Sequence, residues 1–382
     1  MNLTIERELL LENLSFIAKG LPVKTPMPIL TGIKFYLTDT DLFMTSSNSD
    51  ISVEVSISTD DTGLEIVTPG QTIVPGKLFI DIIRKINSKK VNLFLSDDKV
   101  LIIISDRSEF QLHVMNYLDY PKVSFVSQDN PLELDADLIK EIVRETVFAT
   151  SVSEKKPILT GVNFNNIDNR MVITATDSFR LSQKVITLPE YKDFNITIPA
   201  KSLDELSKIV DNYGNKIKLY FSNNKLLVVF KNVCFQTRLL DGNYPQTSSL
   251  IPQTFPIVLK FNKDELLQAV DRVSVISPRD KTTDKELTYS VIRLSLKKDR
   301  IVEISTSNIS QGKAVEQIIP TDIISNTPIT IGFSARYLID SLRSLLSQEV
   351  SINIVSEINP FIIRGDNDAN LTQLILPIRM DS

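Results

Sequence analysis

Hydrophobic and polar positions follow two different periods along the chain, and the same succession of periods occurs three times. Each time, a helical pattern comes first, strand-like alternation follows, and a second, shorter helical pattern comes next. Each succession then ends with two β-rich runs around a polar turn, at 91–105, 217–230 and 350–364. This succession predicts an α+β fold with two helices and antiparallel strands in each unit. The apolar positions of the opening helices are Leu9, Leu10, Leu14, Ile17 and Ala18, then Leu138, Ile139, Ile142, Val143 and Val147, then Leu266, Leu267, Val270 and Val273.

Direct sequence repetition accompanies the recurring pattern. Residues 28–35 read PILTGIKF and residues 157–164 read PILTGVNF, which are identical at six of eight positions with an offset of 129. A third, decayed copy spans 287–294, and the offsets lie near one third of the 382 residues. A repeat of this length is a domain rather than a solenoid unit. We therefore predict three domains of one fold, at 1–126, 127–253 and 254–382, joined by the polar, proline-containing segments 124–131 and 249–256.

The second helix of each unit carries two basic residues seven positions apart. Positions i and i+7 share one helical face and lie roughly 10 Å apart. An ordinary solvated surface explains any single pair well, but three pairs in register also favour a grip on a phosphate backbone that reads no bases. The pairs are Lys77 and Arg84, Lys201 and Lys208, and Arg336 and Arg343.

Composition and charge limit the alternatives. The net charge is −5, which argues against a generally basic nucleic-acid binder but allows one restricted basic surface. The hydrophobic content of 42% suffices for several packed domains, and no apolar run reaches the roughly 18 residues of a membrane helix. The start, MNLTIERELL, has no signal-peptide order, so we expect a cytoplasmic protein.

Few residues are suited to catalysis or metal binding. The chain has one histidine, His113, and one cysteine, Cys234, too few for a His/Cys zinc site, and His113 lies in a strand-like stretch. The segment 70–77 resembles a phosphate-binding loop but has five residues between its glycines where four are needed, and Leu78 replaces the required hydroxyl residue. We predict no catalytic residue, no cofactor and no metal, although an enzyme built from three α+β repeats stays open as an alternative.

Three motifs, in this order and spacing, resemble a known family. They are ATDSFRL at 175–181, LDGNYP at 240–245 and LILPIR at 374–379, and with the threefold unit they look like the bacterial DNA polymerase III beta subunit, the sliding clamp. The resemblance implies three clamp domains per chain, with antiparallel sheets outside and two helices per domain lining a central pore. It further implies a head-to-tail homodimer that forms a ring around double-stranded DNA. Such a ring is opened by a clamp loader and tethers the replicative polymerase and repair proteins, which gives processivity.

The resemblance also assigns residues. It adds Lys24, Lys156 and Ser153 as DNA contacts, where Ser153 stands in place of a longer side chain of some relatives. It places Phe110 and Leu112 of one subunit against Val275 and Ile276 of the other. It implies a pocket for a short partner peptide, formed by Leu159, Thr176, Phe179, Arg180, Leu181, Pro245, Leu250, Pro360, Leu374, Leu376, Pro377, Ile378 and Arg379.

Two features depart from the family pattern. Phe179 stands where many members have histidine, and Met380, Asp381 and Ser382 extend the chain beyond Arg379. Both are expected to change peptide preference. They keep open a second alternative, a specialised clamp paralogue in repair or drug tolerance.

Overall fold

A computed structural model describes residues 1–60, 63–126, 130–210, 216–222, 224–276, 279–281, 288–297, 300–309, 311–325 and 327–379. Three parts of the predictions lie outside these residues: the centre of the first predicted joint, the start of the third repeat copy at Leu287, and the tail at 380–382.

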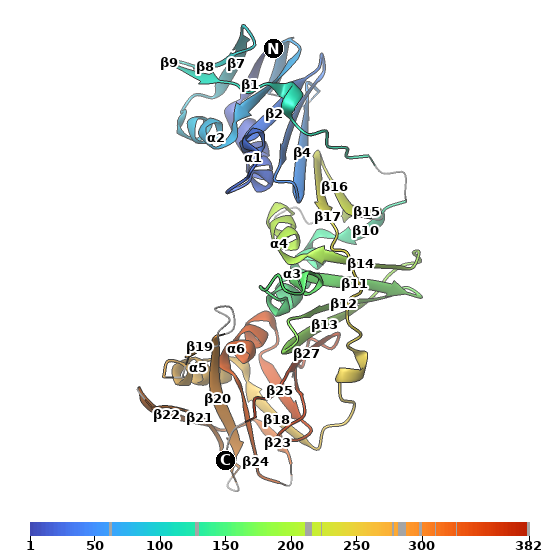
Figure 1. Ribbon diagram of the computed structural model, residues 1–382, viewed down its shortest axis with the longest axis vertical. Helices are drawn as coiled ribbons and strands as arrows, with labels where there is room; N and C mark the ends of the chain where they lie inside the picture. Colours follow the sequence, from blue (N-terminus) through green and yellow to red (C-terminus); the bar gives the residue numbers. More distant parts are fainter. Residues whose placement is uncertain are drawn as a thin grey trace. The chain divides into compact units, whose positions relative to one another are not determined.

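The first repeat begins with a strand and a helix, continues with sheet strands, and ends with a second helix and three strands (Figure 1). The PILT motif forms a short 3-10 helix, Pro28–Thr31, directly before β2. In chain order the elements are β1 (Asn2–Glu6), α1 (Arg7–Ile17), β2 (Gly32–Leu37), β3 (Asp41–Ser47), β4 (Ile51–Ser58), β5 (Leu64–Thr68), β6 (Gly70–Pro75), α2 (Gly76–Lys85), β7 (Lys90–Ser96), β8 (Val100–Ser105) and β9 (Ser108–His113).

The second repeat follows the same order. Its PILT motif again forms a 3-10 helix, Pro157–Thr160, before the first long strand. The elements are β10 (Leu132–Asp135), α3 (Ala136–Thr146), β11 (Gly161–Ile167), β12 (Arg170–Thr176), β13 (Arg180–Thr187), β14 (Phe194–Pro199), α4 (Ala200–Ile209), β15 (Lys216–Phe221), β16 (Lys225–Phe230) and β17 (Val233–Arg238).

The third repeat completes the pattern, and all six predicted helices and three predicted hairpins are confirmed. Each hairpin follows the second helix of its repeat, as β7–β8, β15–β16 and β25–β26. The elements are β18 (Ile257–Asn262), α5 (Lys263–Ser274), β19 (Arg279–Lys281), β20 (Thr288–Leu296), β21 (Val302–Asn308), β22 (Gly312–Ile318), β23 (Asp322–Ile324), β24 (Ile329–Ser334), α6 (Ala335–Ser344), β25 (Glu349–Ile354), β26 (Phe361–Gly365) and β27 (Leu371–Ile375).

Sheets continue from one repeat into the next. Strand β17 of the second repeat pairs with β4 of the first within an eight-stranded sheet, and β27 of the third pairs with β13 of the second within a nine-stranded sheet. The chain accordingly forms two compact units, Met1–Ile139 with Ser202–Leu239 and Lys140–Lys201 with Leu240–Ser382. Because these units divide the second repeat, they do not test the predicted boundaries at 126/127 and 253/254, which stay a prediction.

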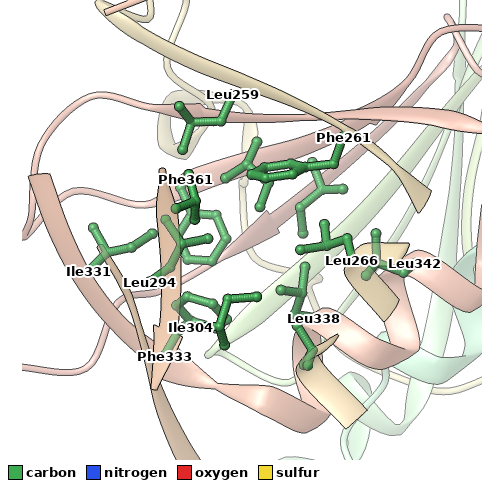
Figure 2. Close-up of a cluster of buried hydrophobic side chains, with 14 of the residues drawn as sticks. Leu259, Phe261, Leu266, Leu294, Ile304, Ile331, Phe333, Leu338, Leu342 and Phe361 are labelled. Atoms are coloured by element: carbon green, nitrogen blue, oxygen red, sulfur yellow. The ribbon is translucent and has the colours of Figure 1, made fainter. Parts of the chain in front are cut away.

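The core of the third repeat shows how the helices are held. The apolar faces of α5 and α6 lie against the sheet strands, and Figure 2 shows Leu266, Leu338 and Leu342 pointing toward Leu294 and Phe333. All five side chains are fully buried. Replacing one such leucine by alanine typically costs about 2–5 kcal/mol, so this packing, rather than helix propensity, stabilises the short helices.

Among the described residues, no helix combines the length and the apolar character that crossing a membrane would require.

Candidate functional site

The ATDSFRL motif forms a tight turn between β12 and β13. The Asp177 carboxylate accepts hydrogen bonds from the backbone N–H groups of Phe179 and Arg180 at 2.9 and 3.0 Å, and the Thr176 hydroxyl donates to the Arg180 carbonyl at 2.6 Å. Ser178 has a φ of 81°, in the left-handed region that short polar residues tolerate best after glycine. These contacts hold Phe179 in place, with 38% of its surface exposed.

Arg180 anchors this turn to α6. Its guanidinium donates to Asp177 Oδ2 at 3.0 Å and to Asp340 Oδ2 at 2.6 Å, and it lies 4.5 Å from the centre of the Tyr337 ring. The residue is only 6% exposed. Burial raises the pKa of the Asp177 carboxyl, and the positive charge of Arg180 opposes that rise. The predicted pocket residue Arg180 is therefore first of all a paired cation that positions the turn.

A cavity of about 250 Å³, here the Phe179 cavity, opens beside this turn. The segment 150–159, the turn and the start of α6 line it. It brings together the predicted pocket residues Leu159, Phe179 and Arg180, and also three residues predicted as DNA contacts, Ser153, Lys156 and Arg336. Val152 and Tyr337 are among the lining residues that sequence reasoning did not assign to any site. The position of Tyr337, directly after a predicted basic residue on a helix, was the only signal for it.

The predicted leucines of β13 and β27 form an apolar cluster next to the cavity. Leu181 and Leu374 face each other across the two strands and are each 3% exposed, packed with Ile362. Leu376 is partly buried at the margin of this cluster, together with Ile251 and Phe255, which sequence reasoning missed. The Leu376 N–H donates to the Phe179 carbonyl at 2.9 Å, which joins the cluster to the turn. Leu181 and Leu374 thus belong to the buried packing beside the cavity. Leu376 keeps part of its side chain exposed, where it is accessible to a ligand.

The other predicted pocket residues lie apart from one another. Ile378 and Arg379 line a second cavity over β20 and β21, and Pro245 lines a third along β11 to β13. Leu250 is 52% exposed, and Pro360 and Pro377 are half-buried. Thr176 is buried, and its N–H donates to the Tyr244 hydroxyl at 3.0 Å.

Both members of each predicted basic pair are exposed, on α2, α4 and α6. A carboxylate lies between the two cations every time, four residues after the first: Asp81, Glu205 and Asp340. The distance from this carboxylate to a cation of its pair differs among the three helices. Lys208 Nζ lies 2.9 Å from Glu205. Arg84 lies 3.8 Å from Asp81, and Arg336 lies 3.8 Å from Asp340. These acids partly screen the cations. Lys24 is exposed in the loop after α1.

The four residues predicted to contact a second subunit differ in how far their side chains are exposed. Phe110 lies half-buried on β9, an edge strand of its sheet, and Val275 is 79% exposed just after α5, next to the half-buried Ile276. Leu112 is only 6% exposed, because alternation along β9 turns it toward the interior of its own domain. The contact of Leu112 with a second subunit stays a prediction, with little of this side chain exposed in the single chain. The strand predicted around His113 is confirmed, with His113 as its exposed last residue.

Comparison with known proteins covers the chain almost from end to end. Family models of the DNA polymerase III beta subunit match residues 1–124 for the N-terminal domain, 133–246 for the central domain and 248–379 for the C-terminal domain. The beta sliding clamp of Bacillus subtilis is 37% identical over 99% of this chain and all of the relative, and that of Staphylococcus aureus is 34% identical over 99% of both.

Solved structures agree with the sequence comparisons. The DNA polymerase sliding clamp of Bacillus subtilis superposes with a TM-score of 0.93 at 36% identity, covering all of both chains. The DNA polymerase III beta chain of Streptococcus pneumoniae gives 0.94 at 32% identity, covering 99% of this chain and all of that one. Three consecutive domain matches, full-length relatives and the repeated fold place this chain in the bacterial DNA polymerase III beta subunit family, the sliding clamps of DNA replication.

Proposed function

We propose that this chain works in the bacterial cytoplasm as the general replication clamp, without chemistry of its own. Two copies close head to tail around duplex DNA and tether the polymerase and repair proteins that carry clamp-binding peptides. A clamp loader opens the ring. The relatives named above are replication clamps, so we propose this role rather than that of a specialised paralogue.

The observation that carries the proposal is the repeated joint between domains. The last strand of the second repeat, β17, pairs with β4, and the last strand of the third, β27, pairs with β13. Strands β4 and β13 occupy the same place in their repeats, and β22 is their counterpart in the third. Strand β9, the last of the first repeat, and β22 each have one edge to which the described residues add no strand.

Pairing β9 of one copy with β22 of another would repeat the same joint a third time. Such an interface is heterologous, and two copies close it into a ring when the rotation fits. It would also cover two sheet edges that otherwise invite aggregation. Phe110 on β9 and the exposed Val275 after α5 would then lie at this joint, as the family resemblance implies.

The paired helices supply the contact with DNA in this proposal. Exposed cations on α2, α4 and α6 attract phosphates, while the carboxylate within each pair weakens any single contact. Weak, screened contacts without base recognition suit a protein that slides. Topology, rather than affinity, then retains the ring on DNA.

The partner site in this proposal combines the Phe179 cavity with the margin of the Leu181–Leu374 cluster. An apolar surface beside a fixed turn suits a short peptide with one or two large apolar side chains. A bound polymerase then stays near the primer end at high effective concentration.

Retention on closed DNA tests the proposal directly. The chain, loaded onto nicked circular plasmid with a clamp loader and ATP, is expected to co-elute with the DNA on gel filtration and to dissociate once the plasmid is cut. Phe110→Asp places a charge at the proposed joint and is expected to give monomers that are not retained. Val67→Asp serves as the control, because Val67 is exposed on β5, at the edge of the same sheet opposite β9. Equal retention on circular and cut plasmid would refute the ring.

A further inference from the structure

The second cavity, of about 500 Å³, lies over β20 and β21 on the sheet face opposite α5 and α6. Alternation along β20 turns Ile292 and Leu294 into the core, both fully buried, and turns Arg293, Ser295 and Lys297 to the opposite face. We infer that this cavity, here the β20 cavity, is a binding site for an oligophosphate chain, either inorganic or carried by a nucleotide.

Hydroxyl groups form the floor of the β20 cavity. Ser305 lies opposite Arg293 in the strand register, and Ser295 lies opposite Thr330 of β24. Ser295 and Ser305 are only 7% and 8% exposed, although they stand on the face away from the core. The Thr330 hydroxyl donates to Ser295 Oγ at 3.0 Å. These hydroxyls are therefore sheltered from bulk solvent beneath longer side chains.

Cations form the rim. Arg293, Lys297, Lys313 and Arg379 line the cavity with a single carboxylate, Glu303, whose Oε1 lies 3.7 Å from Lys297. In the part of the chain that the structure describes, Arg293, Lys313 and Arg379 have no ion-pair partner. In a chain of net charge −5, this lining is a local excess of positive charge, which favours anions.

Arg379 belongs to the rim because the C-terminal segment is held along the sheet. The Ile378 N–H donates to the Gly332 carbonyl of β24 at 2.7 Å, which extends the chain beside this strand. Family resemblance assigned Arg379 to the peptide pocket, whereas the structure places its side chain with Arg293 and Lys313. The cavity is thus built from five separate segments of the third repeat: β20, β21, β22, β24 and the C-terminal segment.

The chemistry favours phosphate over other anions. Guanidinium and ammonium groups with hydroxyl donors match phosphoryl oxygens, which accept several hydrogen bonds at once. An acidic peptide would find no main-chain partners here, because the N–H and C=O groups under the cavity are bonded within the sheet. The described lining includes no aromatic ring to stack a base. The volume is that of a small-molecule site.

This inference does not depend on the proposed ring. Strand pairing at β22 would use in-plane backbone groups of the edge and would leave the face of the sheet open. The lining residues of the β20 cavity are also distinct from those of the Phe179 cavity. A failure of peptide docking or ring closure would leave the phosphate site unaffected.

Calorimetric titration of the full chain with sodium tripolyphosphate, without magnesium and at low ionic strength, tests the inference. We expect saturable binding that weakens about tenfold in Arg293→Ala and stays within about threefold in Arg293→Lys, which keeps the charge. Arg170→Ala removes another exposed strand arginine and is the matched control, with no expected change. Circular dichroism melting checks that each variant is folded.

Further titrations identify the source of the phosphate. ATP that binds as tightly as tripolyphosphate supports recognition of the phosphate chain alone, and tighter ATP binding supports a nucleotide ligand. Three results would overturn the inference: no saturation up to about 10 mM, equal loss of affinity in Arg293→Ala and Arg170→Ala, or a hexaglutamate peptide that binds more tightly than tripolyphosphate.

Discussion

The buried ion cluster between α3 and β13 permits a quantitative prediction. Lys184 Nζ lies 2.7 Å from Glu145 Oε2 and 2.7 Å from Glu141 Oε1, and Arg144 lies 2.8 Å from the other oxygen of Glu145. Glu145 is 1% exposed and Lys184 6%. Burial raises the pKa of the Glu145 carboxyl, and the hydrogen bond from Lys184 opposes that rise. Lys184→Met therefore leaves a buried carboxylate with one partner, Arg144.

Removing one member of a buried ion pair costs about 3–5 kcal/mol. Because Arg144 remains, and its side chain is about one third exposed, we expect roughly 3 kcal/mol for Lys184→Met at pH 7.5. Glu145→Gln should cost less, since Lys184 keeps the half-exposed Glu141. The double variant is expected to recover much of the loss, because no uncompensated charge remains buried.

The pH dependence follows from the direction of the pKa shift. In the variant, the folded-state pKa of Glu145 lies still further above its ordinary value of 4.5, so the folded chain binds this proton more tightly than the unfolded chain. The carboxyl then costs stability progressively as pH rises from 4.5 through the raised pKa. The deficit of Lys184→Met should accordingly be smaller at pH 5 than at pH 7.5.

Urea unfolding followed by far-ultraviolet circular dichroism is the assay, since the chain has no tryptophan. Protein concentration is held constant because association shifts apparent stability. Lys218→Met, which removes an exposed strand lysine, is the matched control and is expected to stay within about 0.5 kcal/mol of the parent chain. The reasoning is refuted if Lys184→Met and Lys218→Met unfold at the same urea concentration at pH 7.5.

Three further predictions concern single side chains. Burial, with a smaller contribution from Glu54, raises the pKa of the Cys234 thiol to about 11. Alkylation of Cys234 at pH 8, followed by mass spectrometry, should therefore be roughly a hundredfold slower in the folded chain than in urea. Equal rates in the folded and unfolded chain would contradict this. Arg343→Ala should lower the slope of log affinity for linear duplex DNA against log salt by about 1, measured by anisotropy, and an unchanged slope would remove Arg343 from the DNA contacts. Phe179→Ala should weaken a labelled clamp-binding peptide at least about tenfold, whereas exposed Ile319→Ala should not; equal affinities would exclude Phe179 from the docking site.

The repeat and the elements within it were predictable from the sequence alone. Helix α2 and the hairpin β7–β8 rest on short-range patterns, a 3.6-residue period and a polar turn between two β-rich runs, which do not depend on distant residues. The exposure of both members of each basic pair was predictable for the same reason, because a seven-residue spacing places them on one helical face. The motif 175–181 marked the turn that lines the Phe179 cavity, although its residue types alone did not reveal the ion pair from Arg180 to Asp340.

The tertiary structure decided which distant segments meet. Nothing in the periodicity of β17 or β27 shows that they pair with β4 and β13, yet these joints merge three sequence repeats into two compact units. The same joint buries Leu181, which its sequence pattern could not distinguish from an exposed binding residue. The β20 cavity likewise depends on the C-terminal segment lying beside β24. Local periodicity determines an element, but pairing between sheet edges far apart in the chain is settled only when the whole core packs, because many edges offer the same backbone hydrogen bonds.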